Sequence, residues 1–151
     1  MKKTELAKAI IKKYSVEQQI EKMIEEGAEL TVALCHLKQK RVVLDRVAEE
    51  IADCLLVLNQ MDIIFGELTF KEKEIINYLN KPVQIFAIIG DIQALLSVNY
   101  AKKKFKIKQL KELFYCFREK LKTLTIEIGE EKIGDWKEKK RNRMIERLEN
   151  I

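Results

Sequence analysis

Hydrophobic residues recur every three or four positions along most of this 151-residue chain, which is the period of amphipathic helices. The pattern is longest after Ser15, a predicted N-cap with Gln18 as its capping-box partner, and continues to about residue 39. Further helices are expected over about 3–13, 43–65, 70–80, 83–103, 107–128 and 135–149. No strand pattern of useful length is present. The sequence therefore predicts an all-α fold, a helical bundle of about five to seven helices.

Residues that break helices are rare, which agrees with long helical segments. The chain has one proline and five glycines, too few for a loop-rich or all-β fold. Charged residues make up 35% and apolar residues 47%, a balance typical of a folded domain rather than a disordered chain. Residues 1–151 are enough for a single domain with its own core.

Two pairs of segments resemble each other across the halves of the chain. Residues 47–68 align with 110–131 at an offset of 63, and residues 23–34 align with 88–99 at an offset of 65. This pattern indicates a degenerate internal repeat over about 83–130, in which Leu113 stands opposite Glu50 and Cys116 opposite Asp53. Because apolar helices resemble one another by default, an unrelated insertion over about 70–133 is the alternative.

The net charge of +5 is unevenly distributed along the chain. Residues 15–68 carry 11 acidic and 5 basic side chains, a net charge of −6. The remainder carries 13 acidic and 24 basic side chains, a net charge of +11. Metal cations suit the first region, and phosphates suit the second.

Four carboxylates in the acidic region are spaced as two pairs on neighbouring predicted helices. Glu26 and Glu29 are three residues apart, and so are Glu50 and Asp53. Side chains at i and i+3 are neighbours on one helix face, so two antiparallel helices can bring all four around one space. Such carboxylates repel one another, and a hard divalent cation such as Mg²⁺ removes that cost. The spacing therefore favours a metal site within the hairpin 16–66.

Glu50 and Asp53 carry most of this argument, because the helix around them is apolar on nearly every side. A buried charge requires a partner, so these two acids lie where solvated side chains are not expected. Two alternatives compete with a metal site. The acids form ordinary solvated helix faces, or they form buried salt bridges with Arg46, Lys22 or Lys38. Two acid pairs on adjacent helices favour the metal, and the segment holds few basic partners.

The same residues resemble a known protein family. An ExxE motif followed about twenty residues later by ExxD is similar to the motif of the all-α NTP pyrophosphatase superfamily, which includes MazG-like nucleotide pyrophosphohydrolases and dimeric dUTPases. The segments KMIEEGAEL (22–30) and EEIADCLLVLNQM (49–61) resemble the metal-binding helices of that family. The segment KRNRMIERL (140–148) resembles its basic closing helix. The likeness covers residues 16–66 well and residues 136–149 weakly.

The resemblance implies a four-helix metal-binding core and the hydrolysis of (d)NTP to (d)NMP and pyrophosphate, a house-cleaning reaction on the nucleotide pool. It implies Mg²⁺, with Mn²⁺ as a substitute, held by Glu26, Glu29, Glu50 and Asp53. Glu25 or Glu29 is the candidate acceptor of a proton from the attacking water.

Substrate contacts are expected chiefly from the basic C-terminal helix, 135–149. Lys140, Arg143 and Arg147 share one helix face and can hold phosphate oxygens, although a solvated terminal helix is an equal alternative. Gln19 and Asn59 are candidates for the base pocket. The single tryptophan, at position 136, is a candidate to stack on a base or to anchor the last helix to the core.

Compartment and partners follow from simpler features. Cys35, Cys54 and Cys116 form no CxxC motif, so we expect reduced core thiols in a cytoplasmic protein. No apolar run of 18 residues is present, so a membrane span is not expected. The expected partners are a nucleoside triphosphate substrate and a second copy of the chain, with a dimer as the favoured homo-oligomer.

Two other functions remain open from the sequence. One is a catalytically inactive helical protein that senses nucleotides or binds a partner. The other is a nucleic-acid-binding module that uses the KKKFKIK run (102–108) and the basic C-terminus. The four intact acids favour the enzyme. Phe105 and Ile107 resemble core positions within that run, so nucleic acid is not expected as a partner.

Overall fold

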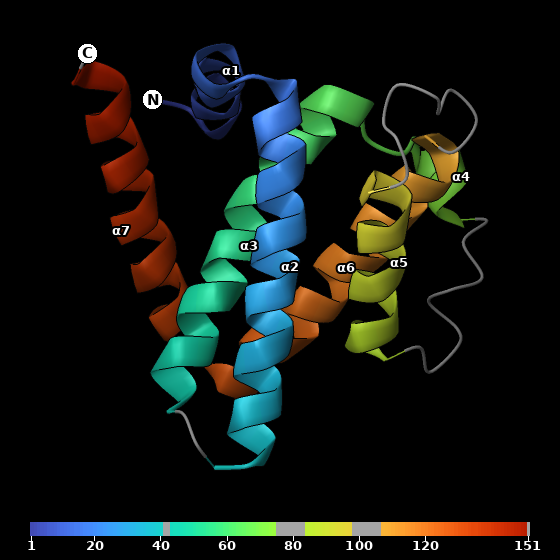
Figure 1. The fold of residues 1–151 in the computed structure, drawn as a ribbon, viewed down its shortest axis with the longest axis vertical. Helices are drawn as coiled ribbons and strands as arrows, with labels where there is room; N and C mark the ends of the chain where they lie inside the picture. The colour runs from blue at the N-terminus through green and yellow to red at the C-terminus, as the bar shows by residue number, and fades with distance from the viewer. Residues whose placement is uncertain (41–42, 75–83, 98–106, 151) are drawn as a thin grey trace.

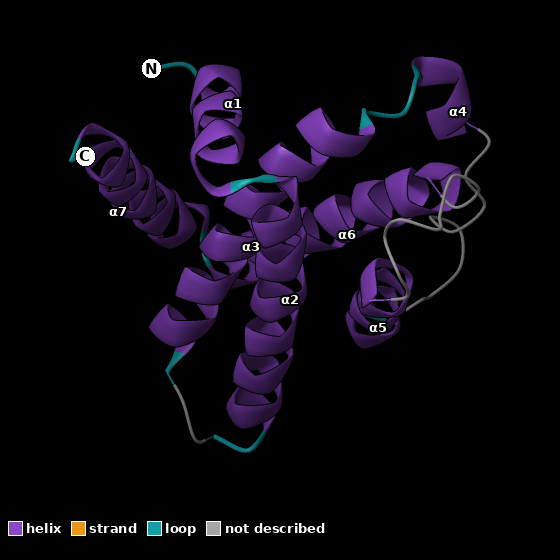
Figure 2. Cartoon of the chain, turned by 45° about the horizontal axis from the view of Figure 1, so that its top comes forward, coloured by secondary structure: helices purple, strands orange, loops and turns teal. Residues whose placement is uncertain are grey.

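The computed structural model describes residues 1–40, 43–74, 84–97 and 107–150. Within these ranges the chain forms seven helices and no strand (Figure 1; Figure 2), which confirms the all-α bundle. The helices are α1 (Lys3–Tyr14), α2 (Val16–Lys38), α3 (Leu44–Phe65), α4 (Phe70–Glu74), α5 (Ile85–Ser97), α6 (Ile107–Ile128) and α7 (Glu130–Glu149). Residues 75–80 and 98–103, where two of the predicted helices continue, lie outside the described residues.

Ser15 ends α1 and begins α2. Its hydroxyl accepts a hydrogen bond from the backbone N–H of Gln18 at 3.3 Å, as predicted. Its own N–H donates to the carbonyl of Ile11 at 2.9 Å, so the returning bond of a capping box has no donor. The left-handed φ of Ser15, 82°, turns the chain between the two helices and leaves α1 across the end of α2 (Figure 1).

Helix α3 lies at the centre of the bundle, as its nearly continuous apolar surface predicts. It contacts α1, α2, α6 and α7. Its fully buried side chains include Val47, Ile51, Cys54, Leu58 and Met61. Because α3 is surrounded in this way, acidic side chains along its middle, such as Glu50 and Asp53, face neighbouring helices, whereas Asp45 in its first turn is exposed.

A second hairpin, α5 and α6, packs against the first hairpin of α2 and α3. Gly27 permits a close approach of α2 to α5, since a Cβ at this position would lie 3.2 Å from Cγ2 of Ile89. Five of the six buried residues of α6, among them Leu113 and Phe117, align at the offset of 63 with buried positions of α3, and Cys116 stands opposite the half-buried Asp53. A shared burial pattern is what a duplication would leave, but the origin of the second hairpin stays a prediction.

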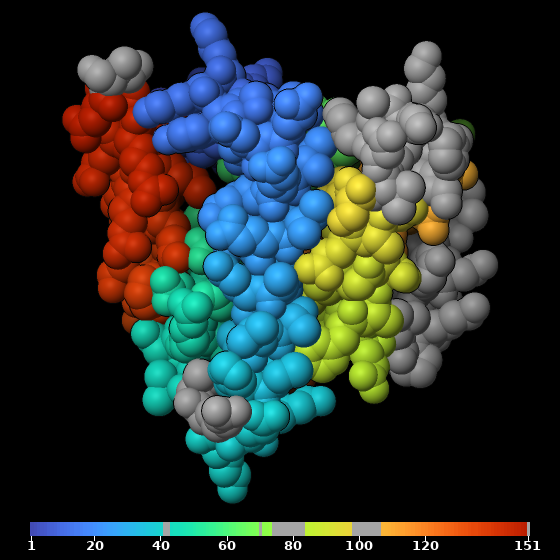
Figure 3. Space-filling view, viewed as in Figure 1, coloured from blue at the N-terminus to red at the C-terminus, as the bar shows by residue number. Residues whose placement is uncertain are grey.

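Helix α7 runs alongside α3 on the side of the bundle away from α5 (Figure 1; Figure 3). It begins at Glu130, earlier than the predicted start near residue 135. Gly129, with a φ of 125°, makes the turn from α6, and Ile133 is anchored in the core with 1% of its surface exposed. The anchor extends the helix through Gly134.

Two smaller expectations about core residues are wrong. Cys54 and Cys116 are buried free thiols as expected, but Cys35 is exposed on α2. Ile107, at the first turn of α6, is 40% exposed rather than part of the core. Phe105 and the rest of the lysine-rich run before Ile107 lie outside the described residues. Among the helices that the structure describes, none combines the length and hydrophobicity that crossing a membrane requires.

Candidate functional site

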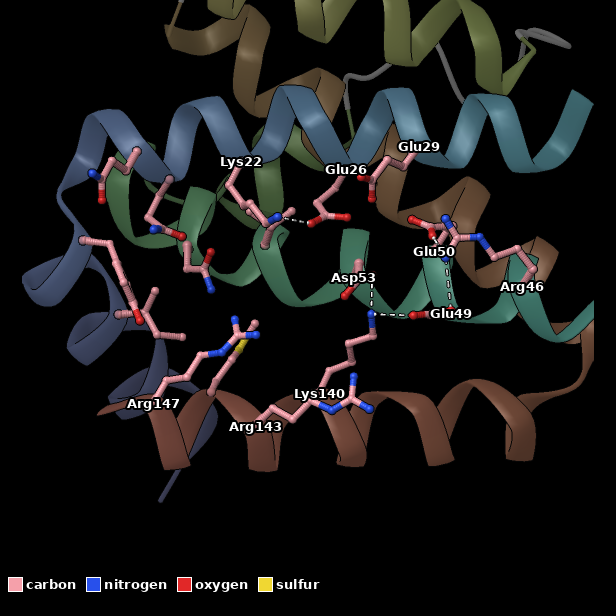
Figure 4. Close-up of a pocket in the computed structure, with 17 residues that line it drawn as sticks. Lys22, Glu26, Glu29, Arg46, Glu49, Glu50, Asp53, Lys140, Arg143 and Arg147 are labelled. Carbon is pink, nitrogen blue, oxygen red and sulfur yellow. Dashed lines mark hydrogen bonds and ion pairs between the residues drawn. The ribbon is translucent and has the colours of Figure 1, made fainter. Parts of the chain in front are cut away.

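A cavity of about 520 Å³ lies between α2, α3 and α7, with α1 at one end (Figure 4). We call it the first cavity. Its lining is unusually rich in charge: five acidic side chains from α2 and α3 face it, together with five basic ones from α2, α3 and α7. The acids are Glu26, Glu29, Glu49, Glu50 and Asp53, and the basic residues are Lys22, Arg46, Lys140, Arg143 and Arg147.

Three of the predicted acids converge from two helices. Glu26 and Glu29 point from α2 toward Glu50 on α3, and each offers one oxygen such that the three oxygens lie within 4.8 Å of one another (Figure 4). Glu26 is 4% exposed and Glu50 is 1% exposed, whereas Glu29 is half-buried. This triad can hold a metal ion, because carboxylate oxygens at this spacing can share one cation.

Each of the two buried acids has one paired oxygen and one unpaired oxygen. Lys22 Nζ lies 2.9 Å from Glu26 Oε1, and an Arg46 guanidinium nitrogen lies 2.7 Å from Glu50 Oε1. Oε2 of Glu26 and Oε2 of Glu50 are buried and have no hydrogen-bond partner within the described part of the chain. Unsatisfied buried carboxylate oxygens are costly, so a cation between them fits the donor set.

Asp53, the fourth predicted ligand, has a different partner. Its Oδ2 accepts a hydrogen bond of 2.7 Å from Lys140 Nζ, which also lies 3.1 Å from Glu49 Oε1. Glu49 is held in addition by Arg46 at 3.2 Å. Asp53 therefore lies beside the triad and is bound to α7 through a lysine.

Burial and the crowding of negative charge shift the pKa values of the acids in this cluster. Burial raises the pKa of Glu26 to about 7 against the pull of Lys22, and nearby Asp53 and Glu29 add to the rise. Burial likewise raises the pKa of Glu50 to about 7 in spite of Arg46. These two carboxyls are costly to ionise together without an additional positive charge.

The pKa values of Asp53 and Glu49, the two acids of the cluster nearest α7, shift in opposite directions. Burial also raises the pKa of Asp53, although Lys140 opposes it. Burial alone would raise the pKa of Glu49, but Lys140 and Arg46 together hold it below its ordinary value. The acids nearest α7 are thus better neutralised than the triad.

The basic face predicted on the C-terminal helix does line this cavity. Lys140, Arg143 and Arg147 point from α7 toward the acids of α2 and α3 (Figure 4). Arg143 and Arg147 are exposed, and neither side chain has an ion-pair partner among the described residues. They are therefore free to receive an anion, whereas Lys140 is engaged by Asp53 and Glu49.

The remaining candidates divide between the cavity and its surroundings. Gln19 lines the first cavity and is 7% exposed. Asn59 does not line it and faces a neighbouring cavity instead. Glu25 is exposed outside the cavity and pairs with Lys22 at 3.3 Å, so it is poorly placed for a role in proton transfer there. Glu29, the other candidate, lines the cavity and has no hydrogen bond or ion pair in the described regions.

Trp136 anchors α7 and does not line the first cavity. Its side chain is half-buried against the hydrophobic core, and its Nε1–H donates to Asp45 Oδ1 at 3.0 Å. Of the two roles that the sequence left open for this residue, the contacts support the anchor.

Several lining residues were not anticipated as part of the site. Glu49, Gln60 and Tyr14 face the cavity, although the sequence singled out none of them. Lys22 and Arg46 were considered only as competing salt-bridge partners, and they do pair with Glu26 and Glu50. Their spacing, four residues before each buried acid, was the available signal. Ion pairing therefore accounts for one oxygen of each buried acid and leaves the other unpaired.

Comparison with known proteins assigns the chain to no family. No family model matches the sequence, and no curated protein or solved structure is significantly similar to it.

Proposed function

We propose that this chain is a Mg²⁺-dependent nucleoside triphosphate pyrophosphohydrolase that converts (d)NTP to (d)NMP and pyrophosphate. The sequence resemblance to the MazG-like superfamily supports this assignment, as does the first cavity. Mn²⁺ is the expected substitute metal, and a homodimer is the expected assembly. The natural substrate is a triphosphate of the nucleotide pool, which suits a house-cleaning role.

One observation carries the proposal. Glu26, Glu29 and Glu50 present oxygens within 4.8 Å of one another, and the second oxygens of Glu26 and Glu50 are buried without partners among the described residues. Opposite them, Arg143 and Arg147, which form no ion pair within the part of the chain that the structure describes, line the same cavity from α7. Carboxylates for a hard cation facing guanidinium groups for phosphate oxygens match a metal–triphosphate complex.

Each group then has a distinct task. Glu26 and Glu50 would hold the cation together with Glu29, and the cation supplies Lewis acidity and neutralises phosphate charge when bound. Glu29, which no basic side chain in the described regions restrains, would accept a proton from the attacking water. Arg143 and Arg147 would hold phosphate oxygens, and water adds across the α–β anhydride bond to release pyrophosphate.

A second candidate has its own supporting observation. Lys140 bonds Asp53 at 2.7 Å, Lys22 and Arg46 pair with the buried acids, and these contacts already neutralise much of the cluster. A protein that binds a nucleotide and does not hydrolyse it would show the same internal pairs. In that case the chain would act as a nucleotide sensor or as a partner-binding protein.

The deciding experiment offers a panel of NTPs and dNTPs with Mg²⁺ to the full chain and measures pyrophosphate release. Glu50→Gln and Asp53→Asn are expected to lower turnover by at least about 100-fold, because each removes a carboxylate charge from the cluster. Asp91→Asn is the matched control: Asp91 is exposed on α5 and does not line the cavity, so its loss should leave turnover unchanged.

The two candidates give different results in a parallel calorimetric titration. Binding of metal and nucleotide without turnover would support the sensor. If the chain neither hydrolyses any nucleotide nor binds a divalent cation, the enzyme proposal is rejected. Circular dichroism of each variant separates loss of the site from loss of the fold.

A further inference from the structure

A second cavity of about 420 Å³ lies between α1, α3 and α7, next to the first. The two cavities share Ile10, Gln60 and Met144 in their walls. Helix α7 serves both, because residues such as Arg143 face the first cavity while Arg141 faces the second. None of the acids of the metal triad lines the second cavity, so its chemistry differs from that of the first.

Positive charge dominates the second cavity. Lys3, Lys137 and Arg141 line it, and Glu138 is the single acidic residue in its wall. None of the three cationic side chains forms an ion pair within the described part of the molecule. Burial and the positive charges of Lys3 and Arg118 lower the pKa of Lys137, which reflects the same excess of positive charge.

Arg141 provides the most specific sign of a missing partner. Its Nε is buried and has no hydrogen-bond acceptor among the residues that the structure describes. A buried guanidinium N–H without an acceptor is costly, so Arg141 lacks a full set of partners while the residue lines the cavity. A guanidinium group is also well suited to phosphate, since its N–H groups match the spacing of phosphate oxygens.

The rest of the wall suits an organic group rather than a bare ion. Leu6, Ala7, Ile10 and Leu56 supply an apolar surface from α1 and α3. Asn59 and Asn142 add amide groups that can donate and accept hydrogen bonds. Asn59, which the sequence had suggested as a substrate contact, thus belongs to this cavity.

We propose that the second cavity binds a small organic phosphate, with its phosphate group on Lys3, Lys137 and Arg141. The organic part then lies against the apolar surface of α1 and α3. This proposal does not rest on the hydrolase assignment, because it uses neither the acids nor the basic face of the first cavity.

The test measures binding of phenyl phosphate and of inorganic phosphate to the full chain by calorimetry, with EDTA present to exclude divalent metals. Saturable binding of one phenyl phosphate per chain is expected, at least about fivefold tighter than inorganic phosphate because the ring gains the apolar wall. Arg141→Gln and Lys137→Gln should each weaken phenyl phosphate binding about tenfold, since each removes a charge-assisted contact.

Two variants on the same helix serve as controls. Arg143→Gln removes an equal charge from the first cavity, and Lys132→Gln removes one from the exposed start of α7. Neither should change binding by more than about twofold, because neither residue lines the second cavity and, without a metal, the five acidic side chains of the first cavity repel phosphate from Arg143.

Several outcomes would overturn the proposal. One is the absence of saturable binding by the unsubstituted chain, and another is equal affinity for the two phosphates. A loss in Arg143→Gln with retention in Arg141→Gln would place the ligand in the first cavity. Equal weakening by all four substitutions would show nonspecific charge attraction. Turnover of nucleotides is measured separately, so failure here leaves the hydrolase assignment untouched.

Discussion

At the scale of single residues, the acids of the first cavity outnumber the cations that pair with them. Five carboxylates line the cavity, and among the described residues three basic side chains, those of Lys22, Arg46 and Lys140, form ion pairs with them. The deficit falls on the most buried members, Glu26 and Glu50, whose second oxygens are unpaired there. Breaking a buried pair is costly because a charge is left uncompensated, and a partial pair retains part of that cost.

This deficit makes the stability of the metal-free protein depend on pH. The pKa values of Glu26 and Glu50 are raised from 4.5 to about 7 in the folded state, so the folded chain binds their protons more tightly than the unfolded chain does. The stabilising contribution of these two carboxyl groups is then fully present below about pH 4.5 and is lost as the pH rises to about 7. The loss is roughly 2–4 kcal/mol, because one pKa unit corresponds to about 1.4 kcal/mol and the two groups are coupled.

Thermal unfolding in EDTA measures this loss directly. The Tm of the chain should fall by several degrees between pH 5 and pH 8, and saturating Mg²⁺ should restore it most strongly at pH 8. Glu50→Gln should show a shallower fall, because one titrating group is gone. A Tm that is flat or rises over this range would contradict the shifted carboxyl groups.

Lys140 is expected to separate metal binding from substrate binding. In Lys140→Met, Asp53 loses the cation that now holds it at 2.7 Å, so Mg²⁺ affinity measured by calorimetry should be retained or increased. On the proposed function, a cation bound beside Asp53 would release Lys140 to a phosphate oxygen, so the KM for the triphosphate should rise about tenfold when this contact is lost. Lys139→Met is the control, since Lys139 lies over the Trp136 ring and does not line the first cavity. Loss of Mg²⁺ binding in Lys140→Met would mean that the lysine supports the site rather than competing for it.

The sequence predicts that the acids of the triad lie close together, but it does not predict which basic side chain pairs with Asp53. Spacing at i and i+3 places Glu26 and Glu29 on one face of α2, and the packing of the consecutive helices α2 and α3 brings Glu50 to them. The bond from Lys140 to Asp53 spans 87 positions and depends on how α7 packs against α3. Helical phase explains the placement of Asn59: it follows Val57, which lines the first cavity, by two residues, and at about 100° per residue the two side chains point to different sides of α3.

At the scale of secondary structure, two glycines end the long helices that carry the two hairpins. Gly66 follows α3 with a φ of 85°, and Gly129 follows α6 with a φ of 125°. Side chains disfavour this left-handed region because Cβ approaches the backbone carbonyl. These positions therefore set where each hairpin stops and the chain turns.

Two glycine substitutions should have opposite effects on the free energy of unfolding. Gly66→Ala should destabilise by about 1–2 kcal/mol through backbone strain alone, because its Cβ would meet nothing closer than Lys111 at 3.9 Å. Gly134→Ala should stabilise by about 0.5–1 kcal/mol, since the site is inside α7 and open to solvent. Urea denaturation of both variants provides the measurement. Equal and small effects would show that the turn at Gly66 tolerates a side chain.

The helices themselves follow closely from the period of apolar residues, and the differences have local causes. The start of α7 differs because Ile133, 1% exposed, anchors the turn before Gly134 to the core. That contact outweighs the helix penalty of one glycine, which is about 1 kcal/mol. The capping box at Ser15 fails because α1 already uses its N–H. In both cases a contact with a neighbouring element determines where the helix begins or how it is capped, and the pattern of one helix alone does not reveal that contact.

At the scale of the whole molecule, the two hairpins have different roles. The hairpin α2–α3 carries the acids of the first cavity on the side that faces α7. The hairpin α5–α6 covers another side of α2 and α3 with buried apolar residues such as Ile92 and Phe117. Where the aligned positions of α3 hold Glu50 and Asp53, α6 holds buried Leu113 and Cys116. The second hairpin thus supports the first without a second cluster at those positions.

This arrangement places every residue of the candidate metal site on one chain. The triad, its basic partners and the residues of α7 opposite it all lie on one chain, so we predict that the candidate site binds its metal without a ligand from a second copy. The dissociation constant for Mg²⁺ should therefore be the same at about 1 μM and about 100 μM protein, whether the chain is monomeric or dimeric at each concentration. Microcalorimetry or competition with a fluorescent chelator measures the constant, and light scattering reports the oligomer in the same samples. Metal affinity that increases as the dimer forms would show that dimerisation completes or orders the site, and would give the second copy a role in the chemistry.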